Sequence, residues 1–181
     1  MTTHHLTAFA ALLLATTTTT ASAGPVRADV EVDPTAYALS GHSIHAGIAW
    51  GHLRLDLGNF AMALPQWVHG EDDFDVSFDG YGAKVHYFLR DDQTGLFGGV
   101  GVGLARVHVK LEGSDRTGDD LQLATGVEVG YRLALPHGFH ATAWLGVGAA
   151  SFTDPVMLDG KTFESPRLQI FPALHLGYRF R

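Results

Sequence analysis

Polar residues that could do ionic or acid–base chemistry recur two positions apart within apolar stretches of this 181-residue sequence. They share one face of an alternating pattern, and they are Lys84, His86, Glu128, Arg132, His140, His175 and Arg179. If that face is enclosed, its charges must be paired, because an unpaired buried charge is costly. We expect Glu128 to be the centre of such a network, paired with Lys84 or Arg132. The network would hold the structure together or, as an alternative, relay protons or act as a gate.

Three further patterns are weaker signs of chemistry. Ser43 and His45 would share a face of one strand, as a nucleophile and its base must, but so short a spacing arises readily by chance. The eleven histidines lack the paired spacing of metal ligands, so we predict no metal site, no cofactor and no catalytic residue. The acidic groups in 71–73 and 112–120 could hold divalent ions, although solvated loop tips are commoner.

The elements that must position these residues read as β-strands. Segments 121–135 and 139–149 alternate apolar with small or polar residues, which is the period of a strand with two unlike faces. Residues 136–138, Pro-His-Gly, predict a tight hairpin turn between them. The same alternation predicts further strands over 26–32, 37–50, 53–64, 74–90, 96–111 and 167–180, the first of them short.

Breaks in the alternation predict how the strands connect. The parity flips at 51–52, where we predict a turn, and slips near Ala105, where we predict a β-bulge. Asp159-Gly160 predicts a type I′ turn at the tip of an extended hairpin over 153–165. From residue 66 onward long and short connections alternate, the asymmetry found in outer-membrane barrels.

The apolar face is predicted to point outward, toward lipid. The opposite face is rich in glycine and bulky aromatics such as Trp144, as a narrow lumen requires, and the strands are long. Aromatic residues beside the short turns suggest a girdle: Tyr87, Phe97, Tyr131, Phe139, Tyr178 and Phe180. The predicted lipid-facing residues include Val85, Tyr87, Val127, Val129, Leu145, Val147, Leu174 and Leu176. A soluble, exported ligand-binding barrel would instead point this series inward.

Composition is consistent with an exported chain. Residues 1–23 combine a short apolar run with Ala21-Ser22-Ala23, which predicts a signal peptide, so that the mature chain is 24–181. The chain has no cysteine, and hence no disulfide framework or thiolate metal site. Its formal charge of −7, without a basic cluster, argues against nucleic acid as a partner.

The alternating hairpins and the final Leu176-Gly177-Tyr178-Arg179-Phe180 resemble small outer-membrane β-barrels of Gram-negative bacteria, the group of the OmpA transmembrane domain and of opacity-type and OmpW-like proteins. The resemblance implies an all-β, eight-stranded antiparallel up-and-down transmembrane barrel with a filled lumen and no open pore. It implies that Tyr178 and Phe180 are read by the barrel-assembly machinery. The expected function is a surface or structural role, with the lipid bilayer and lipopolysaccharide as partners of a monomer; the alternative is a lipid-A-modifying enzyme.

Overall fold

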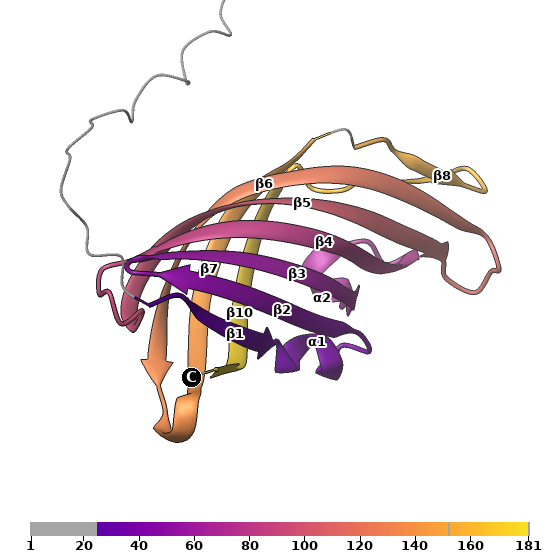
Figure 1. Cartoon of the computed structure of the whole chain (residues 1–181). Helices are drawn as coiled ribbons and strands as arrows, with labels where there is room; N and C mark the ends of the chain where they lie inside the picture. The colour runs from indigo at the N-terminus through magenta and orange to yellow at the C-terminus, as the bar shows by residue number, and fades with distance from the viewer. Residues whose placement is uncertain (1–24, 152, 181) are drawn as a thin grey trace, which may run out of the picture.

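The protein, described here by a computed structural model over residues 25–151 and 153–180, is a closed barrel of eight antiparallel strands (Figure 1). The barrel strands are β1 (Arg27–Val32), β2 (His42–Trp50), β3 (Leu53–Leu64), β4 (Phe74–Phe88), β5 (Gly95–Leu111), β6 (Thr117–Ala134), β7 (Phe139–Ser151) and β10 (Leu168–Arg179). Neighbours in the chain are neighbours in the barrel, so the predicted up-and-down topology is confirmed. The predicted signal peptide lies outside the described residues.

The shortest barrel strand closes the ring. β1 pairs with β2 on one side and with β10 on the other, with Val32 opposite both Ile44 and Leu176. Every barrel strand therefore has two neighbours, and the ring closes through the four residue pairs from Asp29–Arg179 to Val32–Leu176. The weakly alternating segment 26–32 is thus a true strand.

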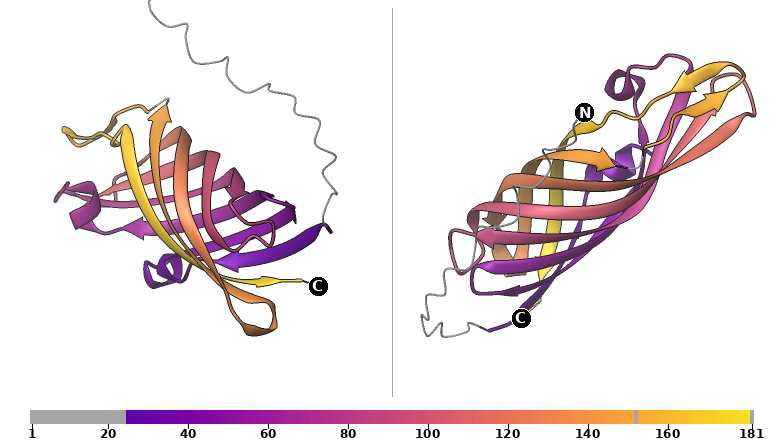
Figure 2. Two further views of the ribbon diagram at one scale, coloured as in Figure 1. Left: turned by 90° about the vertical axis from the view of Figure 1, so that its left-hand side faces the viewer. Right: turned by 90° about the horizontal axis from the view of Figure 1, so that it is seen from above.

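The two ends of the barrel differ, as Figure 2 shows from two sides. At one end lie the tight turns at 51–52, 89–94 and 135–138, each between two strands where the sequence predicts a short connection. Gln93 is fully buried there, and its amide donates to the carbonyl oxygens of Gly51 and Leu53. We call this the short-turn end. The opposite, long-loop end carries α1 (Pro34–Ala38), α2 (Gln66–His69) and the hairpin of β8 (Val156–Leu158) and β9 (Lys161–Phe163). Among the described residues no helix is both long and apolar enough to cross a membrane.

A belt of exposed apolar side chains surrounds the barrel wall. All eight predicted outward residues, from Val85 on β4 to Leu176 on β10, are exposed, and Val127 is 61% exposed. The intervening positions point into the lumen and are largely buried. The orientation predicted from the sequence is therefore the observed one, with the apolar series outside and the polar series inside.

The parity slip near Ala105 is not a bulge, and that prediction was wrong. The register of β5 against β4 and β6 runs without a skipped residue from Gly95 to Lys110. From Gly99 to Leu104 the outward residues of β5 are apolar and the inward ones are glycine. From Arg106 onward the outward residues are polar, while Val107 and Val109 point inward and are buried. The strand keeps its facing, and the sequence changes which face is apolar.

The same reversal occurs on β4, and on β6 the outward residues Thr117 and Asp119 are likewise polar, although the inward Gly118 and Asp120 are not apolar. Residues 74–79, 106–111 and 117–120 and the β8–β9 hairpin together define an outer extension. The hairpin lies beyond the barrel wall near the far ends of β5 and β6 (Figure 1), and Asp159 and Gly160 both have positive φ, as the predicted type I′ turn requires. The extension has its own apolar core, which comprises Phe74, Val76, Val107, Val109, Leu111, Val156, Leu158 and Phe163.

One residue of the predicted aromatic girdle lies elsewhere. Tyr87, Tyr131, Phe139 and Phe180 are exposed around the short-turn end, but Phe97 is 2% exposed and points into the lumen. Its ring lies 4.8 Å from that of Phe88, between centroids. Phe97 is an even number of residues away from the inward glycines of β5. Its side chain therefore points into the lumen, although the residue lies beside a short turn.

Candidate functional site

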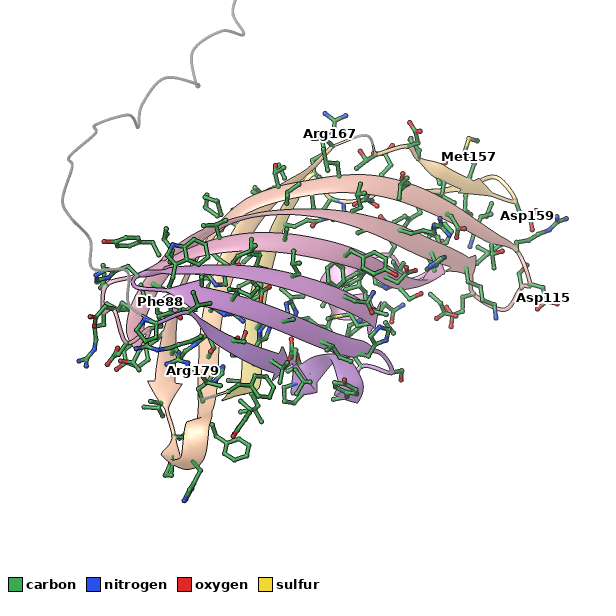
Figure 3. All side chains as sticks on the ribbon, in the orientation of Figure 1. Phe88, Asp115, Met157, Asp159, Arg167 and Arg179 are labelled. Atoms are coloured by element: carbon green, nitrogen blue, oxygen red, sulfur yellow. The ribbon has the colours of Figure 1, made fainter. Side chains whose placement is uncertain are left out.

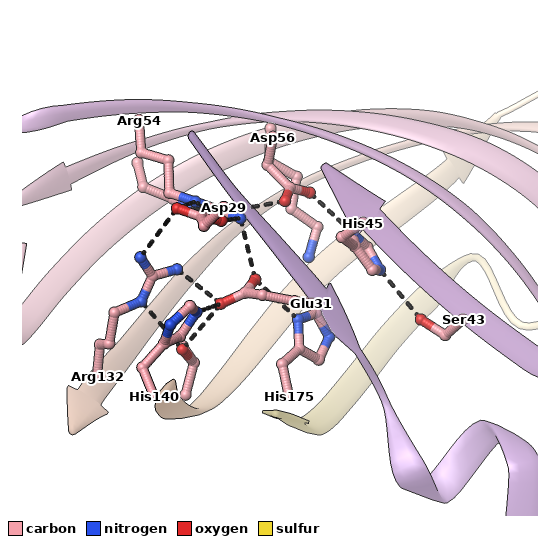
Figure 4. Close-up of polar contacts among 12 residues, drawn as sticks. Asp29, Glu31, Ser43, His45, Arg54, Asp56, Arg132, His140 and His175 are labelled. Atoms are coloured by element: carbon pink, nitrogen blue, oxygen red, sulfur yellow. Dashed lines mark hydrogen bonds and ion pairs between the residues drawn. The ribbon is translucent and has the colours of Figure 1, made fainter. Parts of the chain in front are cut away.

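The lumen contains a buried polar network centred on Glu31 of β1 (Figure 4). One carboxylate oxygen accepts from Arg132 Nη2 at 2.7 Å, His140 Nε2 at 2.9 Å and Thr142 Oγ1 at 3.1 Å. The other accepts from Arg54 Nη2 at 3.1 Å and lies 3.3 Å from His175 Nδ1. These partners come from β3, β6, β7 and β10, so a single carboxylate connects four other strands across the lumen.

Arg54 on β3 is the main cation of this network and is completely buried. Its guanidinium donates to both oxygens of Asp29, to Glu31, and forms an ion pair with Asp56 at 2.8 Å. Three carboxylates around one arginine leave it fully paired. Because a guanidinium presents donors in a fixed fork, this arrangement also fixes the relative positions of β1 and β3.

A second cluster, on β4 and β6, is linked to the first through His86. Glu128 forms an ion pair with Lys84 at 3.1 Å and a short hydrogen bond with His86 Nε2. Arg54 Nη1 lies 3.3 Å from His86 Nδ1, so this nitrogen accepts and the proton of the neutral ring is on Nε2. The Lys84 ammonium lies 3.6 Å from the centre of the Trp144 ring, a cation–π contact.

The structure brings most of the sequence-predicted polar set together, but around a different centre. Lys84, His86 and Glu128 form one cluster, whereas Arg132, His140 and His175 all bind Glu31. Of the two partners expected for Glu128, Lys84 forms the ion pair, and among the described contacts Arg132 pairs with Glu31 instead. Arg179 is half-buried at the short-turn end, where its Nη1 donates to the carbonyl of Asp92 (Figure 3).

Five members of the network were missed by the sequence analysis: Asp29, Glu31, His45, Arg54 and Asp56. Three of these are on β1 and β2 and two on β3, the segments whose alternation was weakest or interrupted. A usable signal was present, since Asp29 and Glu31 alternate with Ala28, Val30 and Val32. The same holds for Arg54 and Asp56 between leucines.

Glycines opposite the large polar side chains provide the space they occupy. A Cβ on Gly58 would collide with the His45 ring, one on Gly177 with the His140 ring, and one on Gly47 with the Arg54 guanidinium. The inward glycines therefore make room mainly for the ionic network. Two aromatic rings also abut such a glycine, Trp144 at Gly146 and Phe97 at Gly130.

Ser43, His45 and Asp56 are arranged as in a serine hydrolase. The Ser43 hydroxyl lies 3.1 Å from His45 Nε2, and His45 Nδ1 lies 2.8 Å from Asp56. Nδ1–H therefore donates to the carboxylate, while Nε2 can accept the serine proton, which is the tautomer that a general base needs. Ser43 is only 3% exposed, so a substrate carbonyl cannot reach its oxygen in this conformation.

Asp29, Glu31 and His140 place three possible metal-ligand atoms within 4.8 Å of one another. Arg54 and Arg132 already bind these carboxylates, and two guanidinium groups oppose a second cation electrostatically. The donor set therefore fits an ion-pair network better than a metal centre.

The network's chemistry is that of a closed, charge-paired interior. With neutral histidines, the four carboxylates Asp29, Glu31, Asp56 and Glu128 face Arg54, Lys84 and Arg132, with Arg179 at the rim. Each lumen histidine contacts a carboxylate, so the network can fix neighbouring strands and can also accept protons.

Comparisons with known proteins support the architecture. No protein-family model matches the sequence, and a search of curated proteins found no match. Over 85% of this chain and 94% of the other, the structure resembles the crystal structure of Neisserial surface protein A (NspA), with a TM-score of 0.51 and 19% identity.

Two further solved structures are similar. The N-terminal β-barrel domain of Pseudomonas aeruginosa OprF gives a TM-score of 0.43 at 15% identity, covering 88% of this chain and 100% of that domain. A major outer membrane protein from Thermus thermophilus gives 0.48 at 12% identity, covering 86% and 100%. The chain has the fold of a small eight-stranded outer-membrane barrel, as the sequence resemblance predicted.

Proposed function

We propose that the protein is an integral β-barrel of the bacterial outer membrane that has a surface or structural role and forms no open pore. The observation that carries the proposal is the continuous apolar belt on the outside of a closed barrel. Exposed apolar patches of this extent are not stable in water. The eight strands pair with one another around a closed ring, the arrangement by which a β-sheet can cross the hydrocarbon of a bilayer.

The filled lumen supports a role other than conduction. Arg54, Arg132, His86, His140 and His175 are all buried and hydrogen-bonded across the barrel. An ion or solute would have to break these contacts to pass. Eight-stranded barrels have an interior just wide enough for side chains, in keeping with this arrangement.

The outer extension supports a surface role. It projects beyond the apolar belt, has its own core, and carries polar side chains outward, as a segment in water should. Single apolar residues at its periphery are strongly exposed, among them Trp67 at 85% and Met157 at 72%. NspA is named a surface protein, which accords with this proposal. The same proposal includes three further points. The protein is a monomer, lipopolysaccharide contacts the apolar belt, and the barrel-assembly machinery recognises Tyr178 and Phe180.

Cysteine labelling in cells tests the location and orientation together, because the chain has no native cysteine. Met157→Cys on the extension and His137→Cys in a short turn are matched exposed positions. A membrane-impermeant maleimide should label the first in intact cells and the second only after the outer membrane is permeabilised. The protein should also remain in the carbonate-washed membrane pellet and migrate differently in gels before and after boiling. Equal labelling of both positions, or release by carbonate, would refute the proposal.

A second candidate function is hydrolysis of an acyl ester, for example in lipid A, and the Ser43–His45–Asp56 geometry favours it. Activity would require the chain that covers Ser43 to move. Membranes containing wild-type protein or Ser43→Ala are treated with a fluorophosphonate probe, and their lipid A is profiled. Labelling that disappears in Ser43→Ala, with a change in lipid A acylation, supports the hydrolase. An unlabelled wild-type protein and identical lipid A profiles reject it.

A further inference from the structure

We propose that the short-turn end of the lumen is a binding site for a small oxyanion, a carboxylate or phosphate group, held between Arg132 and Arg179. A cavity of about 80 Å³ lies there, lined by Arg132, His140 and Arg179 together with Thr94, Leu135 and neighbouring residues. Its volume is roughly that of two or three water molecules, which is enough for an anionic group of a few atoms.

Three of the lining residues carry a buried nitrogen that has no hydrogen-bond partner among the described residues. These atoms are Arg132 Nη1, His140 Nδ1 and Arg179 Nε. Among all described residues only five side-chain atoms are in this state, so three of the five belong to residues lining one small cavity. Two of the three, on Arg132 and Arg179, are N–H donors of charged groups, and a buried donor without an acceptor is unfavourable, more so when it is charged. The shared location of these two donors indicates a common acceptor.

The nearby carboxylates do not fill this role. Glu31 accepts from Nη2 of Arg132 and from His140 Nε2, and Asp29 is bound by Arg54. Arg132 Nη1 lies 3.6 Å from Asp29, which is ion-pair range but beyond a hydrogen bond. Arg179 uses Nη1 on the carbonyl oxygen of Asp92, a neutral group. Arg132 Nη1 and Arg179 Nε thus each lack a hydrogen-bond acceptor among the described residues at this end of the lumen.

The residue types select the ligand chemistry. Guanidinium donors match the geometry of carboxylate and phosphate oxygens and bind them more strongly than they bind neutral acceptors. His140 donates through Nε2 to Glu31, so its Nδ1 can donate only when the ring is doubly protonated. The two arginines are therefore the permanent donors. The site is at the short-turn end, far from the outer extension (Figure 3). An anion would therefore enter it from the side of the membrane opposite to the outer extension.

Anion titration of the purified, folded barrel in a nonionic detergent tests the inference. Phosphate, acetate and chloride are titrated in parallel at matched ionic strength, with calorimetry as the readout. Wild-type protein should bind phosphate or acetate saturably, and Arg179→Gln should weaken binding at least tenfold. Arg90→Gln is the matched control, because Arg90 is an exposed arginine at the same end, paired with Asp92 outside the cavity. It should bind as the wild type does.

A second measurement locates the anion. In crystals soaked with selenate, an anomalous peak within hydrogen-bond distance of both Arg132 and Arg179 supports the site, whereas water alone in the cavity overturns it. Equal heats from phosphate, acetate and chloride, or equal affinity in Arg179→Gln and wild type, also overturn it. If Arg179→Gln does not fold, Arg179→Lys retains the charge without Nε–H and should still weaken binding severalfold. Labelling of the cysteine variants is independent of this result, so either proposal can fail alone.

Discussion

Three strands of the barrel wall, β4, β5 and β6, continue into the outer extension, where their outward residues change from apolar to polar. Along β5, Val100, Val102 and Leu104 face outward and are exposed, whereas Val109 farther along the strand faces inward and is 1% exposed. The pairing register does not change between them. The backbone is thus continuous, and only the assignment of apolar residues to faces is reversed.

The reversal shows that the surroundings of each region decide which face is apolar. Beside lipid, moving an apolar side chain from the outside to the lumen gains little, because lipid is already an apolar environment, and the lumen is left free for ion pairs that connect the strands. In water the same move gains about 25 cal/mol per Å² of buried apolar surface. The change occurs between Asp79 and Tyr81 on β4, Leu104 and Arg106 on β5, and Asp119 and Leu121 on β6. We infer that the outer edge of the hydrocarbon lies along this line.

The largest expected effect comes from breaking the polar interior. Arg54→Met leaves Asp29, Glu31 and Asp56 without their shared cation, and removing one partner of a buried ion pair costs about 3–5 kcal/mol. With three carboxylates affected we expect the upper end of that range, measured by urea unfolding in lipid vesicles. Arg106→Met, on the outward face of the extension, should change stability by less than about 0.5 kcal/mol. Similar losses in both variants would contradict the contrast between the two regions.

The apolar interior of the extension should be locally sensitive instead. Phe163 is 2% exposed and its ring packs against that of Phe74, with centroids 5.7 Å apart. Phe163→Ala should destabilise docking of the β8–β9 hairpin by about 3–5 kcal/mol. Limited proteolysis should then cut the hairpin while the barrel stays resistant. Met157→Ala, on the same hairpin but exposed, should leave the cleavage pattern unchanged; cleavage throughout the barrel would show that the extension is not a separate unit.

The contrast also explains how far the sequence could predict the fold and the site. Strict alternation within a hairpin such as 121–149 predicts the two strands, the turn between them and the face to which each side chain points, because the environment of the residues repeats every second position. At Ala105 the apolar residues move from even to odd positions, which predicts a bulge if the surroundings of the strand stay the same. Periodicity alone cannot show that the surroundings change from lipid to water. The centre of the site was missed for a related reason. Glu31 is on a six-residue strand whose partners on β6, β7 and β10 are about a hundred residues or more away in sequence, as its hydrogen bonds to Arg132, His140 and His175 show.

A charge on the outside sharpens the position of the boundary. Val127→Arg, at mid-wall on β6, should destabilise the inserted barrel by about 2–4 kcal/mol, because the guanidinium would face hydrocarbon. Thr117→Arg places the same side chain outward on the same strand, within the extension, and should be nearly neutral. Both variants are compared by reversible unfolding in vesicles. A Thr117→Arg loss as large as that of Val127→Arg would move the boundary beyond the extension.

The smallest expected effect concerns His108, on the outward face of the extension beyond the belt. Its ring nitrogens contact Asp79 at 2.6 Å and Asp119 at 2.7 Å, and the hydrogen bond to Asp79, followed by that to Asp119, raises the pKa of His108. Because the folded-state pKa is the higher one, the stabilisation is fully present below the unfolded-state pKa and is lost as pH rises through the folded-state value. Exposed pairs of this kind contribute about 0.2–1 kcal/mol. A titration of the His108 ring by NMR should give a pKa above that of a model histidine, and Asp79→Asn should lower it more than Asp119→Asn. If the His108 ring of the wild type instead titrates with the pKa of a model histidine, solvent screens Asp79 and Asp119 fully. The ordered pairing of His108 with these carboxylates would then be contradicted.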